Sequence, residues 1–537
     1  MRVILVSGFG PTHKNDRYVA DTLFDWHRAD HVSRTYFAGR DGFALRELSF
    51  EYDGRRYPLM RPRDYTVPHL TTVTLEAILR AADIEYATVD TSEIWRGMAE
   101  VPDGRVDAVL LSTTFIWDQR TLGRAIDWID SAMPGVPLIL GGQYSNLKHR
   151  RIMASHPRVT AIVRDDGEVA LPAALRTIQA GADLSSVPNV VHRDPRDPTV
   201  VRHNAIGYVD LETYPSPAFT GAYPSVPYES MRGCPFTCKF CSYPLATQRW
   251  RVKSAQKIVK DWLGYVERNA TSFVKAMDST FTVPPARMRK LFDILPSVGV
   301  EWEAYSRANV ITDERYVADL ARSGCRTLSI GFESMSEQNL LNMDKKVTAD
   351  HNRRAVRLLR CSPVGYRCSF MVGYPGETPS AYQTTHDYLV EEFAGHFKLS
   401  VFGMSDETMP LWADQERFGI EMTAADDPDY AWRHIGMDSA TAFELNHRTL
   451  DAVRARNDDA VLIIWQDYYQ RWLLPHVSRT ENLRIEKTVE RIAMLPRDHP
   501  DPARGMTELD RLLDTCARWG ITRTDPATHC RDPLITD

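Results

Sequence analysis

Three closely spaced cysteines are the chemically most informative feature of this sequence. Cys234, Cys238 and Cys241 follow a C-x3-C-x2-C spacing in the segment MRGCPFTCKFCSYP. Cysteine thiolates are the usual ligands of iron–sulfur clusters, and a four-iron cluster has four ligand positions. Three cysteines leave one iron open, where a small molecule can bind and receive an electron. The spacing therefore predicts a [4Fe-4S] cluster held by these three residues.

A zinc knuckle and chance clustering are the competing interpretations of the same loop. Zinc sites usually collect four ligands from paired C-x2-C or Cys/His units, and no such pair follows in this sequence. The remaining cysteines are scattered, which favours free thiols in a reducing cytoplasm. They are Cys325, Cys361, Cys368, Cys516 and Cys530. A second cluster built from the last four is disfavoured because none of them stands in a tight pair.

Length and composition limit the classes of protein to consider. A chain of 537 residues is too long for one ordinary core and predicts two or three domains. A hydrophobic fraction of 43% and a charged fraction of 25% are typical of soluble globular proteins. The net charge of -6 gives no support for a nucleic-acid partner. No apolar run is long enough to span a membrane, and the first ten residues indicate a strand, not a signal peptide. We therefore expect a cytoplasmic protein.

Residues 1–185 alternate between short apolar runs and helical patterns, which predicts a parallel α/β domain. Expected strands lie at 3–9, 84–90, 107–115 and 136–145, with another beginning at 159. Open parallel sheets bind ligands beyond the carboxyl ends of their strands. Polar loops follow three of these strands, at 112–114, 141–143 and 165–168. Residues 186–225, rich in proline and charge, are expected to form a hairpin or linker.

A second βα series covers residues 226–405. Expected strands lie at 227–233, 272–279, 301–309, 326–334, 367–375 and 397–404. Six parallel βα repeats predict an open barrel whose active site lies at the carboxyl ends of the strands. The cysteine loop follows the first strand, where barrel chemistry is expected. Residues 406–537 lose the strand pattern and predict a helical domain that caps the barrel, with helices at 440–456, 460–475 and 481–495.

The cysteine loop resembles that of the radical S-adenosylmethionine (SAM) superfamily, whose members carry the same spacing with an aromatic residue, here Phe240, before the last cysteine. Because an α/β domain precedes the loop, the chain also resembles the cobalamin-dependent branch, in which most known members are methyltransferases. The resemblance is good over residues 100–405. It implies an α/β fold with a Rossmann-like cobalamin-binding domain, a partial (βα)6 TIM-type barrel and a helical C-terminal domain. It also implies three cofactors: a [4Fe-4S] cluster, SAM and cobalamin.

The resemblance places cofactor contacts in two sets of loops. Loops of the first domain would hold cobalamin, at Ser112, Thr113, Thr114, Gly141, Gly142, Gln143, Gly167 and Glu168. The barrel would hold SAM, at Tyr243, Asp278, Ser279, Ser306, Arg307, Glu333 and Ser334. The Arg307 guanidinium can pair with a carboxylate, and Glu333 can accept hydrogen bonds from ribose hydroxyls or an amino group. No catalytic acid or base stands out.

Ordinary structural explanations compete with several of these assignments. Glycines after a strand commonly form turns, so Gly141 and Gly142 indicate cobalamin only in company with the cysteine loop. The segment GYPGET at 373–378 matches a stretch common in this branch, yet a Pro-Gly turn before a helix-starting threonine also accounts for it. Tyr243 can lie along adenine or simply pack against the loop.

The residue below the cobalt is not evident from the sequence. Many cobalamin proteins supply a histidine from a D-x-H-x-x-G loop, and this sequence has no such motif. His13 lies in GPTHKND without that spacing. A cobalt without a histidine ligand would be easier to reduce and better suited to giving up a methyl radical. Arg61, Arg63 and Thr113 are the candidates for this position.

The resemblance implies transfer of a methyl group from methylcobalamin to an unactivated carbon or phosphorus of a natural-product or peptide substrate, as in antibiotic biosynthesis, by means of a 5'-deoxyadenosyl radical. An external donor of the flavodoxin or ferredoxin type would supply electrons. Two alternatives stay open: a non-methylating rearrangement or cyclisation with the same cofactors, and a non-catalytic cobalamin or redox sensor. A methylthiotransferase would need a second cluster, for which the other cysteines are poorly placed.

Residues after the barrel are expected to shape the substrate pocket. Glu407 follows the last barrel strand and is a pocket candidate by position. A second group resembles a W-x-H-x-x-M pattern of some relatives, although a Trp–His pair is more often core packing. Its members are Trp432, His434, Met437 and Asp438. A third group of aromatic residues at helical spacing is predicted to be core or, where exposed, to hold substrate: Trp465, Tyr468, Tyr469 and Trp472.

Overall fold

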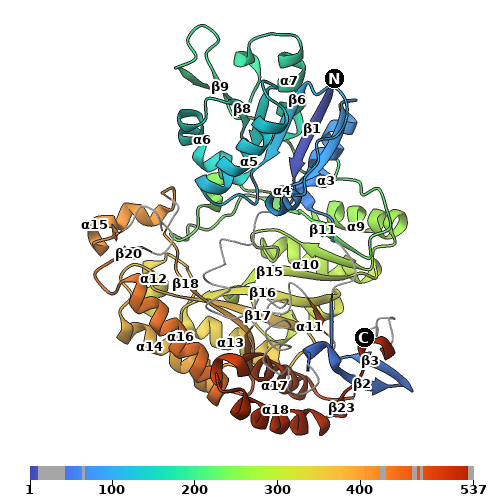
Figure 1. The fold of residues 1–537 in the computed structure, drawn as a ribbon, viewed down its shortest axis with the longest axis vertical. Helices are drawn as coiled ribbons and strands as arrows, with labels where there is room; N and C mark the ends of the chain where they lie inside the picture. Colours follow the sequence, from blue (N-terminus) through green and yellow to red (C-terminus); the bar gives the residue numbers. More distant parts are fainter. Residues whose placement is uncertain are drawn as a thin grey trace.

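The computed structural model describes residues 1–9, 43–62, 67–404, 407–423, 431–462, 469–471, 474 and 476–529. These residues contain two seven-stranded sheets, each with its own helices. The first sheet forms the upper body in Figure 1 and the second forms the lower body, with the C-terminal helices at its base. The predicted fold class is confirmed, because a Rossmann-like domain precedes a partial barrel that is followed by helices.

Five parallel strands form the centre of the first sheet, in the order β5–β1–β6–β7–β8. Their bounds are β1 (Arg2–Ser7), β5 (Glu85–Asp90), β6 (Ala108–Ser112), β7 (Leu138–Gly141) and β8 (Val159–Val163). The strand order reverses between β1 and β6, because the chain returns across β1 before it forms β6. Ligands of such sheets bind beyond the carboxyl ends of the strands at this reversal point.

Helices cover both faces of the first sheet. Ile4 and Val6 of β1 pack into one apolar cluster with α4, α5 and α6, whereas Val3 and Leu5 pack into another with α3 and α7. The bounds are α3 (Leu70–Ala81), α4 (Thr91–Arg96), α5 (Gln119–Ala132), α6 (Gln143–Ser155) and α7 (Gly167–Gln179). Burial on both faces explains why these strands read as continuous apolar runs in the sequence.

The segment expected as a hairpin or linker forms a hairpin that extends the first sheet. Strand β9 (Val190–Arg193) pairs antiparallel with β8, and β10 (Val201–His203) pairs antiparallel with β9. The Asn204 side-chain amide donates to the carbonyls of Leu184 and Val187 and fixes the hairpin to the sheet edge. The first sheet therefore extends beyond residue 185.

Seven parallel strands form the second sheet, in the order β11–β14–β15–β16–β17–β18–β21. Their bounds are β11 (Ser225–Tyr228), β14 (Phe273–Ala276), β15 (Glu301–Arg307), β16 (Cys325–Glu333), β17 (Gly365–Val372), β18 (Gly395–Val401) and β21 (Ala460–Leu462). Among the described strands, β11 and β21 do not pair, so the barrel stays open between them.

Helices surround this sheet on its outer side. They are α9 (Ala255–Asn269), α10 (Pro285–Ile294), α11 (Glu314–Arg322), α12 (Glu337–Asn342), α13 (Ala349–Arg360), α14 (Pro379–Asp387) and α16 (Ser439–Arg456). Along β17, Tyr366, Cys368, Phe370 and Val372 are buried in the main apolar core, and the residues between them are only half-buried. The period of two separates a helix-facing side from a barrel-facing side.

Residues 43–62 depart from the predicted N-terminal domain. Strands β2 (Leu48–Tyr52) and β3 (Arg55–Pro58) form a hairpin whose outer partner is β23 (Ile521–Arg523), near the far end of the chain. Phe50 belongs to the apolar core of the barrel, not to either cluster of the first sheet. A two-stranded hairpin is marginally stable by itself, and here the third strand comes from the C-terminal region.

One helix expected in the C-terminal region is wrong. The segment 460–475 was predicted to be an amphipathic helix, but residues 460–462 form β21 beside β18 and residues 469–471 form β22 (Tyr469–Arg471). A short apolar run fits a buried strand as well as a helix, and the free edge of β18 selects the strand. Strand β22 pairs with β4 (Met60–Pro62). Helices α17 (Arg479–Asp498) and α18 (Pro502–Ala517) follow.

None of the helices in the described ranges is both long enough and apolar enough to cross a membrane.

The pairing of residues 43–62 with the barrel core leads to a stability prediction. Phe50 is 1% exposed, so Phe50→Ala should lower the free energy of unfolding by about 3–5 kcal/mol, measured by denaturant titration. Tyr52→Ala is the matched control on the same strand, because Tyr52 is 38% exposed and should contribute under about 1 kcal/mol. Equal effects of the two substitutions would contradict this packing.

Candidate functional site

The cysteine loop begins beyond the carboxyl end of β11. Two short strands, β12 (Met231–Arg232) and β13 (Arg251–Val252), pair antiparallel and close its base. Gly233 adopts φ +77°, and a Cβ there would lie 2.9 Å from the carbonyl oxygen of Arg249. The loop is therefore a closed hairpin whose entry tolerates only glycine.

The three cysteines of this loop are free thiols. Cys238 is buried, and Cys234 and Cys241 are half-buried. The Cys241 amide donates to the Cys238 carbonyl at 3.1 Å, which turns the backbone between them. Burial raises the pKa of the Cys241 thiol to about 11. No group of three His, Cys, Asp or Glu side chains in the described residues has the spacing of a single-ion site.

Arg307, at the end of β15, lies directly against the cysteine loop. Its Nη1 is 3.6 Å from the Cys238 sulfur, and its guanidinium lies 3.8 Å from the centre of the Phe236 ring. Nη2 donates to the carbonyl of Lys345. The structure thus brings a buried guanidinium to the middle cysteine. The contact of Arg307 with the carboxylate of SAM stays a prediction.

Glu333 ends β16 in a left-handed conformation, with φ +63°. Its Oε1 accepts from Lys345 Nζ at 2.8 Å, and the same ammonium lies 5.2 Å from the centre of the Phe240 ring. Sequence reasoning missed Lys345, because nothing in its local pattern distinguishes it from a surface lysine. A Cβ on Gly331 would collide with the Glu333 carboxylate and lie 2.9 Å from Lys345 Nζ.

Asp278 and Ser279 hold the entry of the cysteine loop. The Asp278 carboxylate accepts from the backbone amides of Ser230 at 2.7 Å and Met231 at 3.0 Å, and also from the Ser230 hydroxyl. Ser279 donates to the Gly233 carbonyl at 3.2 Å. Burial raises the pKa of Asp278 to about 6. Both side chains are therefore engaged by the protein itself.

The remaining predicted SAM contacts lie around the same strand ends. Ser306 shares a 2.9 Å hydrogen bond with Thr282. The Ser334 hydroxyl is fully buried, 3.3 Å from that of Thr385, and accepts from the Ser336 amide at 3.1 Å. Tyr243 begins α8 (Tyr243–Ala246) just after the last cysteine, and burial raises the pKa of its phenol. The contacts of Ser306, Ser334 and Tyr243 with SAM stay predictions.

In the first domain, the loops after β6 and β7 bind each other. The Thr113 hydroxyl donates to the Gly141 carbonyl at 2.8 Å and accepts from the Ser145 amide at 3.0 Å. Gly142 has φ +103°, and a Cβ there would lie 2.8 Å from the Thr114 amide nitrogen. Thr114 therefore occupies the space that a side chain at position 142 would need. Ser112, Gln143 and Gly167 occupy the adjoining ends of β6, α6 and α7.

Sequence reasoning missed an aromatic group at the reversal point of the first sheet. Phe9 follows β1, Phe115 and Trp117 follow β6, and His69 precedes α3. The His69 ring lies 4.8 Å from that of Phe9 and 4.9 Å from that of Phe115, both edge-to-face. Phe9 is 53% exposed and Trp117 38%. The signal available in the sequence was the presence of aromatic residues at the ends of two predicted strands.

Carboxylates of the first domain meet cations of the cysteine loop. Asp166 accepts from Arg232 at 2.9 Å and from Arg251 at 2.6 and 2.9 Å, and Glu168 accepts from Arg232 at 2.5 Å. Burial would raise the pKa of Asp166, but the bonds and charges of Arg251 and Arg232 outweigh it and hold the pKa below its usual range. Glu168 pairs with Arg232 between the domains, and its predicted contact with cobalamin stays a prediction.

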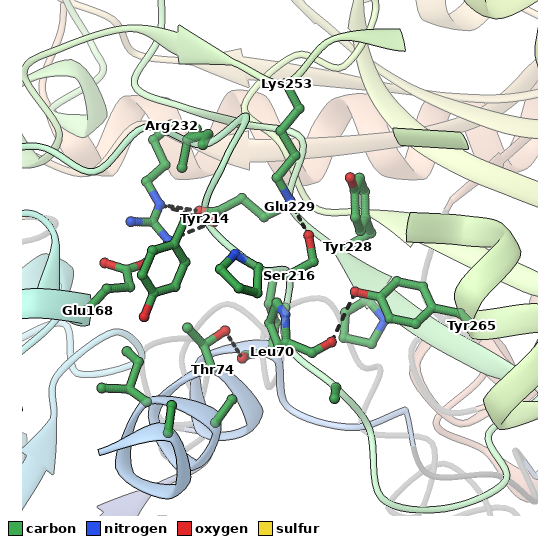
Figure 2. A pocket seen from close by; sticks show the side chains of 18 of the residues that line it. Leu70, Thr74, Glu168, Tyr214, Ser216, Tyr228, Glu229, Arg232, Lys253 and Tyr265 are labelled. Atoms are coloured by element: carbon green, nitrogen blue, oxygen red, sulfur yellow. Dashed lines mark hydrogen bonds and ion pairs between the residues drawn. The ribbon is translucent and has the colours of Figure 1, made fainter. Parts of the chain in front are cut away.

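A cavity of about 230 Å³ lies at this domain boundary (Figure 2). Helix α3 borders it on one side, and Arg232, Glu229 and Lys253 border it on the other. Lys253 donates to Ser216 at 2.8 Å, and Arg232 pairs with Glu229 at 3.0 Å. The charged groups along its wall are thus already paired within the protein.

A further contact joins the domains through Glu407, which pairs with Lys148 of α6. Glu407 thus makes a contact between domains, and its role in a substrate pocket stays a prediction. In the tail, the Trp432 and His434 rings stack 5.3 Å apart, and His434 Nδ1 accepts from the Gly436 amide at 3.0 Å. Burial lowers the pKa of His434 to about 4. This pair packs on the 373–378 turn as core.

The turn at 373–378 is itself held by Glu377, whose carboxyl oxygens accept from the Gly373 amide and the Asn339 side chain at 2.7 Å. Met437 is buried, and Asp438 caps α16. Several predicted residues lie outside the described side chains: His13, Arg61, Arg63, Trp465, Tyr468, Tyr469, Trp472 and Cys530.

Comparisons with known proteins agree with this architecture. A model of the radical SAM superfamily matches residues 228–389, which include the cysteine loop. An uncharacterised methyltransferase of Pyrococcus horikoshii is 23% identical over 296 residues, 53% of this chain and 63% of that protein. An anaerobic magnesium-protoporphyrin IX monomethyl ester cyclase of Rubrivivax gelatinosus is 23% identical over 269 residues, 47% of this chain and 48% of that protein. The matches thus span less than two thirds of these relatives.

Two solved structures share the fold. The radical SAM methyltransferase TsrM from Kitasatospora setae, with cobalamin and a [4Fe-4S] cluster bound, has a TM-score of 0.58 at 13% identity and covers 93% of this chain and 100% of its own. The cobalamin-dependent SAM radical enzyme OxsB has a TM-score of 0.51 at 15% identity and covers 93% of this chain and 66% of its own.

These findings define the class of protein: the barrel with its cysteine loop is a radical SAM domain. The match covers residues 228–389, and the fold across both sheets is like that of the two solved structures. The resemblance of the cysteine loop to the radical SAM superfamily is confirmed for this domain. A radical SAM domain implies a [4Fe-4S] cluster and SAM as cofactors.

The ion pairs between the domains yield a second prediction. Asp166→Asn removes the charge that neutralises Arg232 and Arg251, so the free energy of unfolding at neutral pH should fall by about 3–5 kcal/mol. Because the pKa of Asp166 is lowered, this stabilisation is present above the usual pKa of aspartate and is lost only as the pH falls through its lower folded value.

The matched control is Asp194→Asn. Asp194 pairs with Arg202 at 2.6 Å on the surface, and its removal should leave the stability unchanged. Denaturant titrations of both variants beside the unmodified protein measure the difference. A loss no larger for Asp166→Asn than for the control would mean that Arg232 and Arg251 do not depend on this carboxylate.

Proposed function

We propose that this protein is a cobalamin-dependent radical SAM methyltransferase that acts on a natural-product or peptide substrate. The observation that carries the proposal is that the carboxyl ends of the two sheets meet at one domain boundary. Asp166 and Glu168 follow β8, and they pair with Arg232 beside the cysteine loop that follows β11. Cofactors held at the two edges would face each other across this boundary.

The residues at the barrel edge fit an iron–sulfur cluster with SAM on its open iron. Three free thiols lie in one loop, and the cations Arg307 and Lys345 lie beside it, so negative charge on the thiolates would be balanced. Glu333, held by Lys345, would accept hydrogen bonds from the amino group or ribose of SAM. Asp278 and Ser279 would keep the loop entry in place.

The first domain fits a large, mostly apolar cofactor at its reversal point. Phe9, Phe115 and Trp117 present aromatic surface there, which a planar ligand could cover. When bound, the cluster would supply the electron, SAM the radical and methylcobalamin the methyl group that the reaction needs. The protein would bind and orient the substrate and exclude water from the radical.

Enzymes of this superfamily act on small molecules and take electrons from an external reductant. We infer the finer assignment, methylation at carbon or phosphorus with a flavodoxin- or ferredoxin-type donor, from the methyltransferase relatives. One relative is named a cyclase, which supports the alternative of a rearrangement or cyclisation. The product mass distinguishes them, because methylation adds one CH2 and rearrangement does not.

The first experiment measures cofactor content after anaerobic reconstitution with iron, sulfide and hydroxocobalamin. We expect about four irons and one cobalamin per chain. Cys238→Ser should lose most of the iron, whereas Cys361→Ser, which changes an exposed cysteine outside the loop, should retain it. Transfer of labelled methyl from SAM to the bound cobalamin then tests the donor reaction. A protein that retains iron but no cobalamin would contradict methyl transfer from methylcobalamin and would indicate an ordinary radical SAM enzyme.

The predicted contact between Glu333 and SAM can be tested by a substitution at Gly331. Gly331→Ala should displace the Glu333–Lys345 ion pair and weaken SAM binding about tenfold or more, measured by equilibrium dialysis on the reconstituted protein, with the iron content retained. Gly123→Ala is the control, because a Cβ there meets nothing within 4 Å. Unchanged SAM affinity in Gly331→Ala would contradict a contact between Glu333 and SAM.

A further inference from the structure

A groove lies on the outer side of the barrel, between α13 and the π-helical turn η7 (Tyr388–Glu392) that follows α14. This α13–η7 groove has a volume of about 790 Å³, and its wall carries four arginines of α13. They are Arg353, Arg354, Arg357 and Arg360. None of the described residues that line the groove belongs to the cysteine loop or to the domain boundary, so it is separate from the site described above.

The helical period of α13 explains why these arginines share one face. Residues three or four positions apart are neighbours on a helix surface, with Cβ atoms about 5–6 Å apart. Ala355 and Leu359 are fully buried in the barrel core, which fixes their face of α13 inward. The arginines consequently stand on the outer face of the helix, and the groove is the space that they share.

Two of the four arginines are already paired within the protein. Glu392 of η7 accepts from Arg353 Nε at 3.1 Å and from its Nη2 at 3.4 Å. Asp459, which lies outside the groove, accepts from Arg360 at 3.4 Å. These two guanidinium groups therefore form part of the wall and are held in place by carboxylates.

The other two, Arg354 and Arg357, pair with no carboxylate of the described residues. The carboxylates that line the groove are Asp350 and Glu392, which stand beside four arginines and leave an excess of two positive charges. This excess lies on a chain whose net charge is -6. The charge of Arg354 and Arg357 is thus not neutralised by the protein itself.

Two guanidinium groups on successive turns of one helix suit a pair of phosphates, because each guanidinium can donate two parallel hydrogen bonds to one phosphate group. We propose that the α13–η7 groove binds an anionic ligand with two linked phosphate groups, held by Arg354 and Arg357. A stable protein partner would need about 800 Å² of contact from each side, so a concave groove between two helical segments favours a small ligand. The proposal does not depend on the proposed function, because the groove lies outside the cofactor sites.

The probe is inorganic pyrophosphate, and the reporter is Cys361, which lines the groove. Cys361 is exposed, whereas the other described cysteines are buried or half-buried. Its alkylation by iodoacetamide, a neutral reagent, is followed by mass spectrometry on the reconstituted protein, with the iron content measured before and after. We expect pyrophosphate well above its Kd to slow this alkylation about fivefold or more.

Three further additions show whether the slowing reports a diphosphate site. Sodium chloride at matched ionic strength tests simple charge screening, and inorganic phosphate tests a single anion. Equal slowing by either, or no slowing by pyrophosphate, would overturn the proposal. Slowing by ADP as well as by pyrophosphate would assign the site to nucleotides, and slowing by pyrophosphate alone would assign it to the free anion; both outcomes support a diphosphate site.

Substitutions of the two arginines provide the second readout. Arg357 is exposed, so Arg357→Gln should preserve the melting temperature while it removes one guanidinium. We expect it to raise the pyrophosphate concentration for half-maximal slowing about tenfold, and Arg354→Gln to act likewise. The matched control is Arg315→Gln, an exposed arginine of the neighbouring helix α11 outside the groove, which should leave that concentration unchanged. An unchanged concentration in a folded Arg357→Gln would overturn the proposal.

Discussion

The buried carboxylate of Asp166 is the contact on which the arrangement of the two domains depends. It follows β8 in the first domain, and both of its guanidinium partners, Arg232 and Arg251, belong to the strand pair that closes the cysteine loop. Arg232 stands two residues before Cys234. A buried charge that loses its partner costs several kcal/mol, so the loop cannot change its position without disturbing the domain contact. The geometry of the cysteine loop and the docking of the first domain therefore depend on each other.

Positive charge concentrates where the thiols are. Arg307 and Lys345 lie on different segments, yet both contact the cysteine loop, and each lies near a phenylalanine of that loop. These cations would favour three thiolates and the net negative charge of a cluster. Glu333 keeps Lys345 in place and remains directed to the same region. The polar groups of this edge form a connected set, which explains why many strand-end residues here are engaged before any cofactor binds.

Segments that are far apart in the sequence contribute to the barrel core. The hairpin of residues 43–58 pairs with β23 and packs into the barrel core, and β21 extends the barrel sheet from the C-terminal region. Contacts between segments this distant form only in the folded chain, because closing so long a loop has an entropic cost that many simultaneous contacts must offset. The barrel is consequently completed by segments that a linear division into domains assigns elsewhere.

The sequence by itself determined the cysteine loop, its place after the first barrel strand and the two α/β units, because ligand spacing and hydrophobic period are local properties. The contact of Arg307 with Cys238 was visible only in the structure. Only the tertiary structure decided that Glu168 pairs with Arg232, that the Ser334 hydroxyl is buried, and that His69 lies at the reversal point. Each of these depends on which distant segment supplies the partner. No pattern within a single segment carries that information, since the same side chain can bind a cofactor or a neighbouring strand.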